Sequence, residues 1–543
     1  MDARIERLGD EQAIRDVLAR YWRGIDRRDA ALVESSYHPD AYDDHGYYKG
    51  SISGFVESLG PGVWAYFENT QHFSGQIAVE FNASDRASVE SYAEAHHIRR
   101  RQDGSFEDLV YGLRYVDRFA RRDGEWRIAH RVCTWDWHRI DATGGIPLGD
   151  GYFRGHHSHR DPVYRHPQSV GHRVGPDALV AKQACYDTLM RYARGVDRCD
   201  PELVRSTYHP DAYDDHGGYQ GDAKGFIEWV KPTVMDSFTC TMHKLGNVLI
   251  EVDAEQAFAE TYAVVHHVQA EQETPSDLIM GVRYIDRLEQ RSGEWKIADR
   301  VMSFEWERTL EIRSQDEAEV FKRGLRDGSD PVLRRAPAAE KAPAAQNVSA
   351  AQKTPAPQKT LSARDAPAAQ REFASRASLS GPAAFDRVAD RSAIYAALLR
   401  YCRGVDRRDE GLIRSAYHAD ASDDHGAYQG GIDGLVEYIR KEVDSRFQIT
   451  MHKLGQALIE IDADVAHSEA YAICHHIQTE KGKGLIDLVA GIRYIDRFER
   501  RDGIWRIAQR EIRSEWVRTD PLEALDPSWT LGRTDSSDPV FAE

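Results

Sequence analysis

An aspartate and a histidine recur three times along this chain with the same separation of 46 residues. A carboxylate that holds an imidazole fixes its tautomer and stabilises its protonated form, which lets the imidazole remove a proton from carbon near neutral pH. The structural alternative is that each aspartate caps a helix or pairs with neighbouring arginines, while the histidine lies on a solvated strand. Retention of all three pairs favours the chemical interpretation. The pairs are Asp26 with His72, Asp197 with His243, and Asp406 with His452.

A tyrosine precedes each aspartate by five residues, at Tyr21, Tyr192 and Tyr401. A phenol can donate a hydrogen bond to a carbonyl or to a departing hydroxyl, so it can act as an acid or an electrophile. Five helical residues rotate by about 140°, so the tyrosine and the aspartate share a pocket only if that pocket surrounds the helix end. A core tyrosine on the apolar stripe of the helix is the equally favoured alternative.

Histidine doublets follow in segments with the period of a strand. Neighbouring strand residues point to opposite faces, so one histidine of each doublet should enter a pocket. The doublets are His96 and His97, His266 and His267, and His475 and His476. Two arginines per copy could bind a carboxylate, an enolate or a leaving halide, although arginines on the outer face of a sheet are commoner. They are Arg114, Arg283 and Arg493 in one set, and Arg131, Arg300 and Arg510 in the other.

The stretch HPDAYDDHG, beginning at His38, is the most conspicuous repeated motif. Two aspartates and a histidine this close could ligate a metal, but the chain has no HxH, HxxxH or HExxH spacing beside them. The pattern favours a tight turn leading into the first strand, in which the carboxylates satisfy backbone donors and Gly46 adopts an unusual φ. We therefore expect no metal at this motif. The histidines of the motif, His45, His216 and His425, remain candidates to line a pocket.

The elements that must position these residues repeat three times at constant offsets. In the first copy, Ile14, Val17, Leu18, Tyr21 and Ile25 have helical spacing. Asp29 is placed to cap a second short helix, and a third follows the DDHG motif. Segments with a period near two and turn residues between them come next, which predicts hairpin-linked strands. The expected class is α+β, with helices packed on one face of a curved antiparallel sheet.

Each copy has the size of a whole domain rather than of a solenoid repeat. We expect domains at residues 1–165, 176–334 and 384–543, a short linker at 166–175 and a longer one at 335–383. The longer linker is rich in Ala, Pro, Gln and Lys, and this composition predicts a flexible, partly extended tether.

Composition narrows the classes of function. The formal net charge of -18 over 543 residues argues against a nucleic-acid surface. The six cysteines form no CxxC pair and no framework, which is typical of reduced thiols in a cytoplasmic protein. The chain shows neither a signal peptide at its start nor an apolar run of about 18 residues, so we expect neither secretion nor a membrane span.

The helix carrying YxxGxD, the HPDAxDDHG stretch and the closing RYxDRxxxxxGxWxIAxR strands together resemble the SnoaL-like branch of the nuclear transport factor 2-like superfamily. The resemblance covers each copy nearly end to end. It implies a cone-shaped α+β barrel whose sheet and helices enclose a pocket. Members include scytalone and bile-acid dehydratases, hexachlorocyclohexane dehydrochlorinase, polyketide cyclases, ketosteroid isomerases and non-catalytic proteins.

By this resemblance, His72, His243 and His452 are general bases and Asp26, Asp197 and Asp406 orient them. It also implies that Tyr21, Tyr192 and Tyr401 face the pocket, and it favours His97 as the inward member of the first doublet. The other two doublets are offset by one residue, so His267 and His476 are the candidates there while the choice within those doublets stays open. Arg131, Arg300 and Arg510 lie near the position of an arginine in the dehydrochlorinase. The implied activity is a cofactor-independent lyase or isomerase acting on a hydrophobic, ring-containing small molecule. The alternative is a non-catalytic ligand-binding or scaffold protein of the same fold.

Several catalytic members of the family form homotrimers. Three copies in one chain predict a covalent pseudo-trimer that is a monomer in solution, in which the recurring DPV triplets at Asp161, Asp330 and Asp538 pack on a neighbouring copy.

Overall fold

The computed structural model describes residues 3–143, 153–154, 175–269, 276–311, 382–480, 482 and 484–522. The three DPV triplets lie outside these ranges, as do both predicted linkers apart from Gly175, Pro382 and Ala383. The predicted domain limits at 165, 334 and 543 therefore also lie outside the described residues.

Every copy has the same order of elements, beginning with one long helix. The first copy contains α1 (Ala3–Arg27), α2 (Ala30–Ser35), β1 (Tyr37–Asp44), β2 (Lys49–Ser51), α3 (Ile52–Leu59), the π-helical turn η1 (Gly60–Trp64), β3 (Asn69–Ala83), β4 (Arg86–Arg100), β5 (Phe106–Arg122) and β6 (Glu125–Thr143). The second contains α4 (Pro176–Asp197), α5 (Pro201–Ser206), β8 (Tyr208–Asp215), β9 (Gln220–Asp222), α6 (Ala223–Val230), η3 (Lys231–Met235), β10 (Cys240–Asp253), β11 (Gln256–Gln269), β12 (Ser276–Arg291) and β13 (Glu294–Glu311). The third contains α7 (Pro382–Asp406), α8 (Glu410–Ala416), β14 (Tyr417–Asp424), β15 (Gln429–Gly431), α9 (Ile432–Tyr438), η7 (Ile439–Val443), β16 (Ile449–Asp462), β17 (Val465–Glu480), β18 (Gly484–Arg501) and β19 (Ile504–Pro521).

The end of the first helix is fixed by local interactions. Arg28 adopts a left-handed φ of 56°, which stops α1, and the Asp29 backbone N–H then bonds to the Gly24 carbonyl oxygen at 2.9 Å. The Asp29 carboxylate caps α2 by accepting from the Leu32 N–H at 2.9 Å, as the sequence predicts. A Cβ on Gly24 would lie 2.8 Å from Val33 Cγ2, so only glycine lets α2 fold back this closely. This sharp ending places the last turn of α1 against the sheet.

The sheet of the first copy has the strand order β2-β1-β6-β5-β4-β3, and the other two sheets follow the same plan. Strands β3 to β6 are joined by antiparallel pairing, as predicted, but β1 pairs with β6 in parallel. The predicted α+β class with helices packed on a curved sheet is therefore confirmed, but the parallel pairing of β1 makes the sheet mixed rather than antiparallel throughout. After β1 the chain passes through β2 and α3 before it enters β3. No hairpin joins β1 to β6, so the two strands need not run antiparallel.

The HPDAYDDHG motif also differs from its prediction. Residues Tyr37–Asp44 form β1, so most of the motif is strand and not turn. The pairing with β6 is irregular between Tyr37 and Tyr42, which accommodates Pro39. Only the end of the motif turns: the Asp44 carboxylate accepts from the Gly46 N–H at 2.9 Å, and Gly46 has a φ of 76°.

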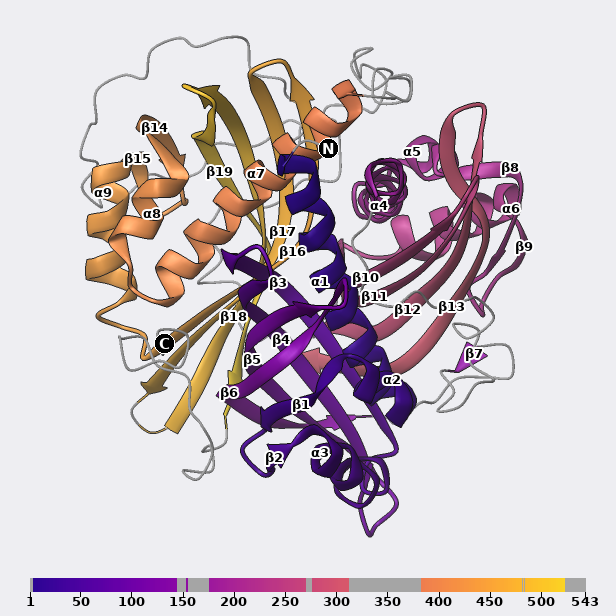
Figure 1. The fold of residues 1–543 in the computed structure, drawn as a ribbon. Coiled ribbons are helices and arrows are strands. Elements are labelled where there is room, and N and C mark those ends of the chain that lie inside the picture. Colours follow the sequence, from indigo (N-terminus) through magenta and orange to yellow (C-terminus); the bar gives the residue numbers. More distant parts are fainter. Residues whose placement is uncertain are drawn as a thin grey trace.

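In Figure 1 the three copies surround a common centre, with α1 running between α4 and α7. Each of these helices contacts the other two, and the edge strands β3, β10 and β16 likewise contact one another. The contacts relating the copies run in one cyclic direction, so the chain forms a pseudo-trimer with an approximate threefold axis. A short piece of the segment after the first copy, β7 (Phe153–Arg154), adds to β13 of the second copy.

Charge pairs between side chains of different copies lie at two of the seams between the long helices. Lys182 of α4 bonds to Asp16 of α1 at 2.6 Å. Arg391 of α7 bonds to Asp187 of α4 at 2.5 Å. The residue equivalent to these cations in α1 is Glu11, which pairs with Arg15 of its own helix. The copies are therefore not interchangeable at this end of the axis.

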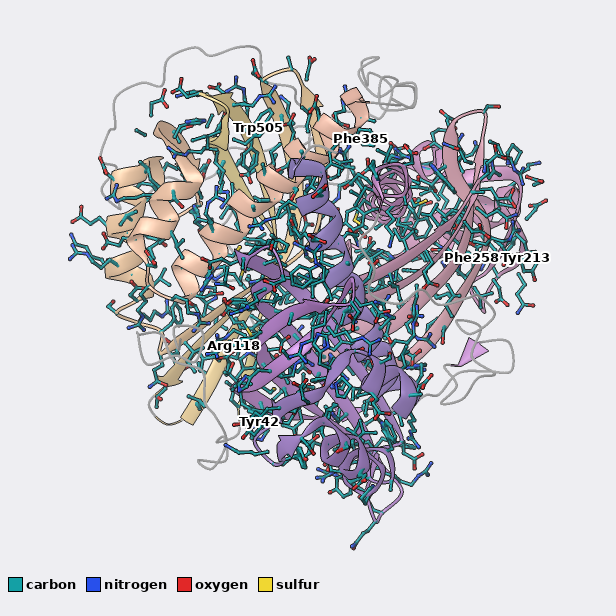
Figure 2. All side chains as sticks on the ribbon, viewed as in Figure 1. Tyr42, Arg118, Tyr213, Phe258, Phe385 and Trp505 are labelled. Atoms are coloured by element: carbon teal, nitrogen blue, oxygen red, sulfur yellow. The ribbon has the colours of Figure 1, made fainter. Side chains whose placement is uncertain are left out.

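Side chains fill the space between sheet and helices in each copy (Figure 2), where Trp22, Phe55 and Trp126 are fully buried in the first. Tyr213, labelled in the same view, lies at the outer edge of the second copy and is 45% exposed.

All six cysteines fall within the described residues and are free thiols. Among the described residues, no helix combines the length and the apolar composition needed to cross a bilayer.

Candidate active sites

The last turn of α1 and the start of β3 bring Asp26 and His72 together. Asp26 Oδ1 accepts from His72 Nδ1 at 2.7 Å, and Oδ2 accepts from the His72 backbone N–H at 2.8 Å. Thr70 donates its hydroxyl to the same carboxylate at 3.0 Å. Asp26 is fully buried and His72 is 6% exposed. The carboxylate thus fixes both the backbone and the ring of the histidine.

The same dyad forms in the other two copies. Asp197 accepts from His243 Nδ1 at 2.6 Å and from its backbone N–H at 2.9 Å. Asp406 accepts from His452 Nδ1 at 2.6 Å and from its backbone N–H at 2.9 Å. Because Nδ1–H donates to the carboxylate, Nε2 is the ring atom of each histidine at which a proton can be gained or lost.

The charge of the dyads is set by burial and by the partner. Burial opposes ionisation of Asp26, but His72, its hydrogen bonds and Arg27 together hold the pKa of Asp26 below its ordinary value. Burial also disfavours the imidazolium of His452, yet Cys474 and Asp406 outweigh it and raise the pKa of His452 well above its usual range. An ionised aspartate beside the histidine stabilises the imidazolium that would form on proton transfer.

The two histidines of each doublet separate as strand geometry predicts. The ring of His97 lies edge-on to that of His72, with centroids 5.3 Å apart. The corresponding separations are 6.0 Å for His267 from His243 and 5.5 Å for His476 from His452. Burial, followed by the charge of His72, lowers the pKa of His97 to about 3, so this ring stays neutral beside the dyad.

The first histidine of each doublet faces another copy. His96 bonds to Asp108 at 2.7 Å and stacks on Trp306 of the second copy, with centroids 4.1 Å apart. Trp306 in turn donates its indole N–H to Gln71 at 2.7 Å. The equivalent contacts between copies are His266 with Trp516, at 4.4 Å, and His475 with Trp137, at 4.6 Å.

The predicted tyrosine belongs to a second hydrogen-bonded chain. Tyr21 bonds through its hydroxyl to His45 Nε2 at 3.0 Å, and His45 Nδ1 bonds to Asp43. Tyr37 donates its hydroxyl to the other oxygen of Asp43 at 2.7 Å. Burial raises the pKa of Tyr21 well above its ordinary value, against the opposing charge of Arg131. The structure therefore joins Tyr21 to the histidine of the DDHG motif.

This second chain also recurs. The hydroxyl of Tyr192 bonds to His216 Nε2 at 2.9 Å, and that of Tyr401 bonds to His425 Nε2 at 2.7 Å. In each case the histidine also bonds to the first aspartate of its DDHG sequence, which is Asp214 or Asp423. These carboxylates hold histidines, and in the described part of the chain no three His, Cys, Asp or Glu side chains gather as a set of metal ligands.

The second set of arginines lies under the tyrosines. Arg131 makes two hydrogen bonds of 2.7 Å to Asp117, and its guanidinium carbon lies 4.1 Å from the centre of the Tyr21 ring. Arg300 with Asp286 and Arg510 with Asp496 repeat this arrangement. All three arginines are at most 1% exposed, and two guanidinium nitrogens of each are bound to aspartate. Their substrate-binding role remains a prediction.

The first set of arginines occupies the contacts between copies. Arg114 pairs with Glu90 at 2.8 Å and with Asp136 at 3.1 Å. Glu90 also receives Arg403 from the helix of the third copy, at 3.2 Å. Arg283 and Arg493 lie in equivalent buried clusters. Arg114 lies directly opposite Tyr92, which shares its face of β4 with His96, so this set lies on the outer face of the sheet where another copy covers it.

The side chains opposite the dyad differ among the copies. Residues directly opposite each other on neighbouring strands point to the same face of the sheet. The cross-strand partners of each dyad histidine therefore form a row of side chains on the same face as its ring. In the first copy Ala95 and Tyr111 continue the row from His72. In the second copy the row from His243 passes through Val265 and Met280. In the third it passes from His452 through Cys474 and Ala490, which puts a small residue in place of Tyr111.

Cys474 is a free thiol beside the dyad of the third copy. It lies directly opposite His452 in the ladder, and its thiol is 3.9 Å from the hydroxyl of Tyr494. Alanine and valine occupy this position in the other copies. At this position in the ladder, directly opposite the dyad histidine, the thiol is present in the third copy alone.

A cavity of about 220 Å³ lies on the shared axis, between the three long helices and the edge strands. Its lining includes Arg15, Tyr186 and Tyr395, which occupy equivalent positions in α1, α4 and α7. None of the dyad histidines lines it. The pocket expected inside each cone remains a prediction.

Sequence reasoning missed Asp43, Tyr37 and Thr70. All three recur in every copy, as Asp214, Tyr208 and Thr241 and as Asp423, Tyr417 and Thr450, and that repetition could have identified them. The repetition does not give the partner of Thr70, because its contact with Asp26 depends on how α1 meets β3.

Comparison with known proteins identifies the family to which the three copies belong. The family model of the SnoaL-like domain matches residues 6–132, 177–301 and 386–511, which is well over half of the chain. Each match spans one copy from the long helix into the last strand. The fold defines a protein of three tandem α+β cones. The chain belongs to the SnoaL-like domain family.

Individual relatives match one copy at a time. Hexachlorocyclohexane dehydrochlorinase 1 of Sphingobium indicum is 27% identical over 128 residues, 23% of this chain and 80% of that protein. A crystal structure of a hexachlorocyclohexane dehydrochlorinase from Novosphingobium barchaimii is 24% identical, with a TM-score of 0.24, covering 26% of this chain and 97% of that one. A putative scytalone dehydratase from Novosphingobium aromaticivorans is 18% identical, with a TM-score of 0.22, covering 27% and 98%.

Proposed function

We propose that this protein is a lyase or isomerase that removes a proton from carbon in a hydrophobic, ring-containing small molecule, without a cofactor. The observation that carries the proposal is the buried dyad, Asp26 with His72 at 2.7 Å, which is repeated in all three copies. The name of the Sphingobium indicum relative, a dehydrochlorinase, supports elimination as the reaction type.

In the proposed elimination, His72 Nε2 takes the proton and the C–H electron pair forms the new double bond. The leaving group departs with the electrons of its own bond. Asp26 stabilises the imidazolium and keeps Nε2 aimed at the substrate. His97 stays neutral beside His72, so it adds no opposing charge.

Tyr21 would assist the departing group indirectly. Neutral His45 donates Nδ1–H to Asp43, so its Nε2 accepts a hydrogen bond from the Tyr21 hydroxyl. In that state the Tyr21 oxygen can only accept a hydrogen bond from another group. If His45 is protonated, Tyr21 is free to donate its own proton and to recover one from His45. We therefore propose a relay role for His45 rather than a direct contact with substrate.

The test is turnover of hexachlorocyclohexane, with release of chloride as the readout, by the full chain and by a variant carrying His72→Gln, His243→Gln and His452→Gln. General-base removal should lower kcat by about 10²- to 10⁴-fold. His130→Gln is the matched control, because His130 stacks on the exposed Tyr42 away from the dyads. If the triple variant retains the full rate, or if ring-bearing ligands bind tightly without any turnover, the protein is a binding or scaffold member of the family instead.

We also propose that the chain acts as a monomer, because its three copies already supply the contacts of a trimer. Light scattering coupled to size-exclusion chromatography should give 61.6 kDa. A mass of twice or three times that value would contradict the proposal.

A further inference from the structure

Three carboxamide side chains at equivalent positions reach from one copy into the next. They are Gln76 of β3, Asn247 of β10 and Gln456 of β16, and each is buried. Their targets are backbone groups of the strand that carries a candidate base. Each amide bonds to its target strand through both its nitrogen and its oxygen.

The contact with the first copy is made by Asn247. Its Nδ2 donates to the carbonyl oxygen of His72 at 2.8 Å, and its Oδ1 accepts from the Ser74 N–H at 2.6 Å. The amide therefore spans residue 73 and holds the backbone on both sides of it. His72 is the residue whose ring is bonded to Asp26.

The other two contacts complete a cycle. Gln456 of the third copy donates to the carbonyl oxygen of His243 and accepts from the Leu245 N–H at 2.9 Å. Gln76 of the first copy donates to the carbonyl oxygen of His452 at 2.5 Å and accepts from the Leu454 N–H at 2.8 Å. The second copy thus holds the first, the third holds the second, and the first holds the third.

Strand geometry explains why these backbone groups need a partner from outside the sheet. β3 is an edge strand, and the N–H and C=O of one strand residue point to the same side. The His72 N–H points to Asp26 and not to β4, so its carbonyl also lies on the open edge. A buried carbonyl left unbonded is destabilising, and Asn247 supplies the missing donor.

Each dyad is therefore held from two sides, by an aspartate of its own copy and by a carboxamide of another. We infer that Asn247, Gln456 and Gln76 are positioning residues for the bases of the neighbouring copies, so that no site is complete within its own copy. This inference rests on the proposed function of the dyads as general bases. It also gives a physical reason for linking three copies in one chain, since each site requires a specific neighbour.

The decisive experiment compares two backgrounds that each leave one base. The site-1 background carries His243→Gln and His452→Gln, and the site-2 background carries His72→Gln and His452→Gln. Adding Asn247→Ala should lower kcat on hexachlorocyclohexane by about 10- to 100-fold in the site-1 background, with a smaller change in KM, because displacement of a catalytic group mainly affects the chemical step. In the site-2 background it should leave kcat within about twofold.

Two further variants of Asn247 separate positioning from folding. Asn247→Gln keeps the amide and is the residue found at this position in the other copies, so it should restore most of the rate. Asn247→Asp keeps the acceptor for Ser74 but loses the donor to the His72 carbonyl, so its rate should fall between those of the wild type and the alanine variant. Gln456→Ala should show the reverse pattern and impair only the site-2 background.

A readout independent of turnover distinguishes failure of this inference from failure of the proposed function. In full-length protein labelled with ¹⁵N-histidine, Asn247→Ala should shift the ring resonances of His72 and leave those of His243 unchanged. If no variant turns over any substrate but this pattern holds, the positioning role stands and the assigned reaction fails. If Asn247→Ala leaves His72 unchanged, or perturbs His243 as strongly, the inference is overturned.

Discussion

Arg131→Met should destabilise the first copy strongly, because it leaves a buried aspartate without its partner. Both Arg131 and Asp117 are buried, with side chains 0% exposed, and they are joined by two hydrogen bonds of 2.7 Å. Removal of one member of a buried ion pair typically costs about 3–5 kcal/mol. Arg122→Met is the matched control, because Arg122 and its partner Asp40 are 47% and 68% exposed and such pairs contribute about 0–1 kcal/mol.

The loss should depend on pH in a defined direction. Burial raises the pKa of Asp117 above its ordinary value even with Arg131 present, and without the guanidinium the folded-state pKa should rise further. A raised folded-state pKa means that the folded variant binds the proton more tightly than the unfolded chain does. The destabilisation is therefore greatest above the folded-state pKa and shrinks as the pH falls towards the unfolded value of about 3.9, by up to about 1.4 kcal/mol per pH unit.

Urea unfolding at several pH values, followed by tryptophan fluorescence, measures both effects. Replacing Asp117 as well, in Arg131→Met with Asp117→Leu, removes the buried charge and should recover most of the stability. The reasoning is refuted if Arg131→Met is no more destabilising than Arg122→Met, or if its effect grows as the pH falls.

Two further variants test the contacts around a site and between the copies. Ala490→Tyr places in the third copy the tyrosine found at this position in the first, beside Cys474. It should slow alkylation of Cys474 by iodoacetamide several-fold, as followed by peptide mass spectrometry. An unchanged rate would show that the side chain at position 490 does not cover the thiol. Lys182→Met leaves Asp16 without its cation at a seam where the side chains are 10% and 7% exposed, and it should lower the free energy of unfolding by about 3 kcal/mol in urea. Lys231→Met, at an exposed pair, is the control, and equal effects would show that the seam contributes little.

Some of the architecture was predictable because it is written in local patterns. The apolar spacing from Ile14 to Ile25 predicts α1, and Asp29 caps α2 where the sequence places a cap. The strands follow from alternation and from turn residues between them. The parallel pairing of β1 with β6 was not predictable in the same way, because it depends on where the chain returns after the helices rather than on any residue pattern.

Part of the candidate site was also predictable from local spacing. The constant spacing of Asp26 and His72 identified a pair that does form a hydrogen bond, and the alternation of a strand separated His97 from His96. The partner of Tyr21 was not predicted, since the tyrosine and His45 belong to different elements and meet only when β1 packs beside α1.

By itself, the sequence determined what repetition and local periodicity can encode: three copies, the order of their elements, and the pairing of each aspartate with its histidine. The tertiary structure alone decided what depends on contacts between copies. It placed Arg114 in an ion-pair cluster and His96 against Trp306, and it brought Asn247 to the carbonyl of His72. These contacts join residues far apart in the chain, and no pattern within one copy records which neighbour will meet its open edge.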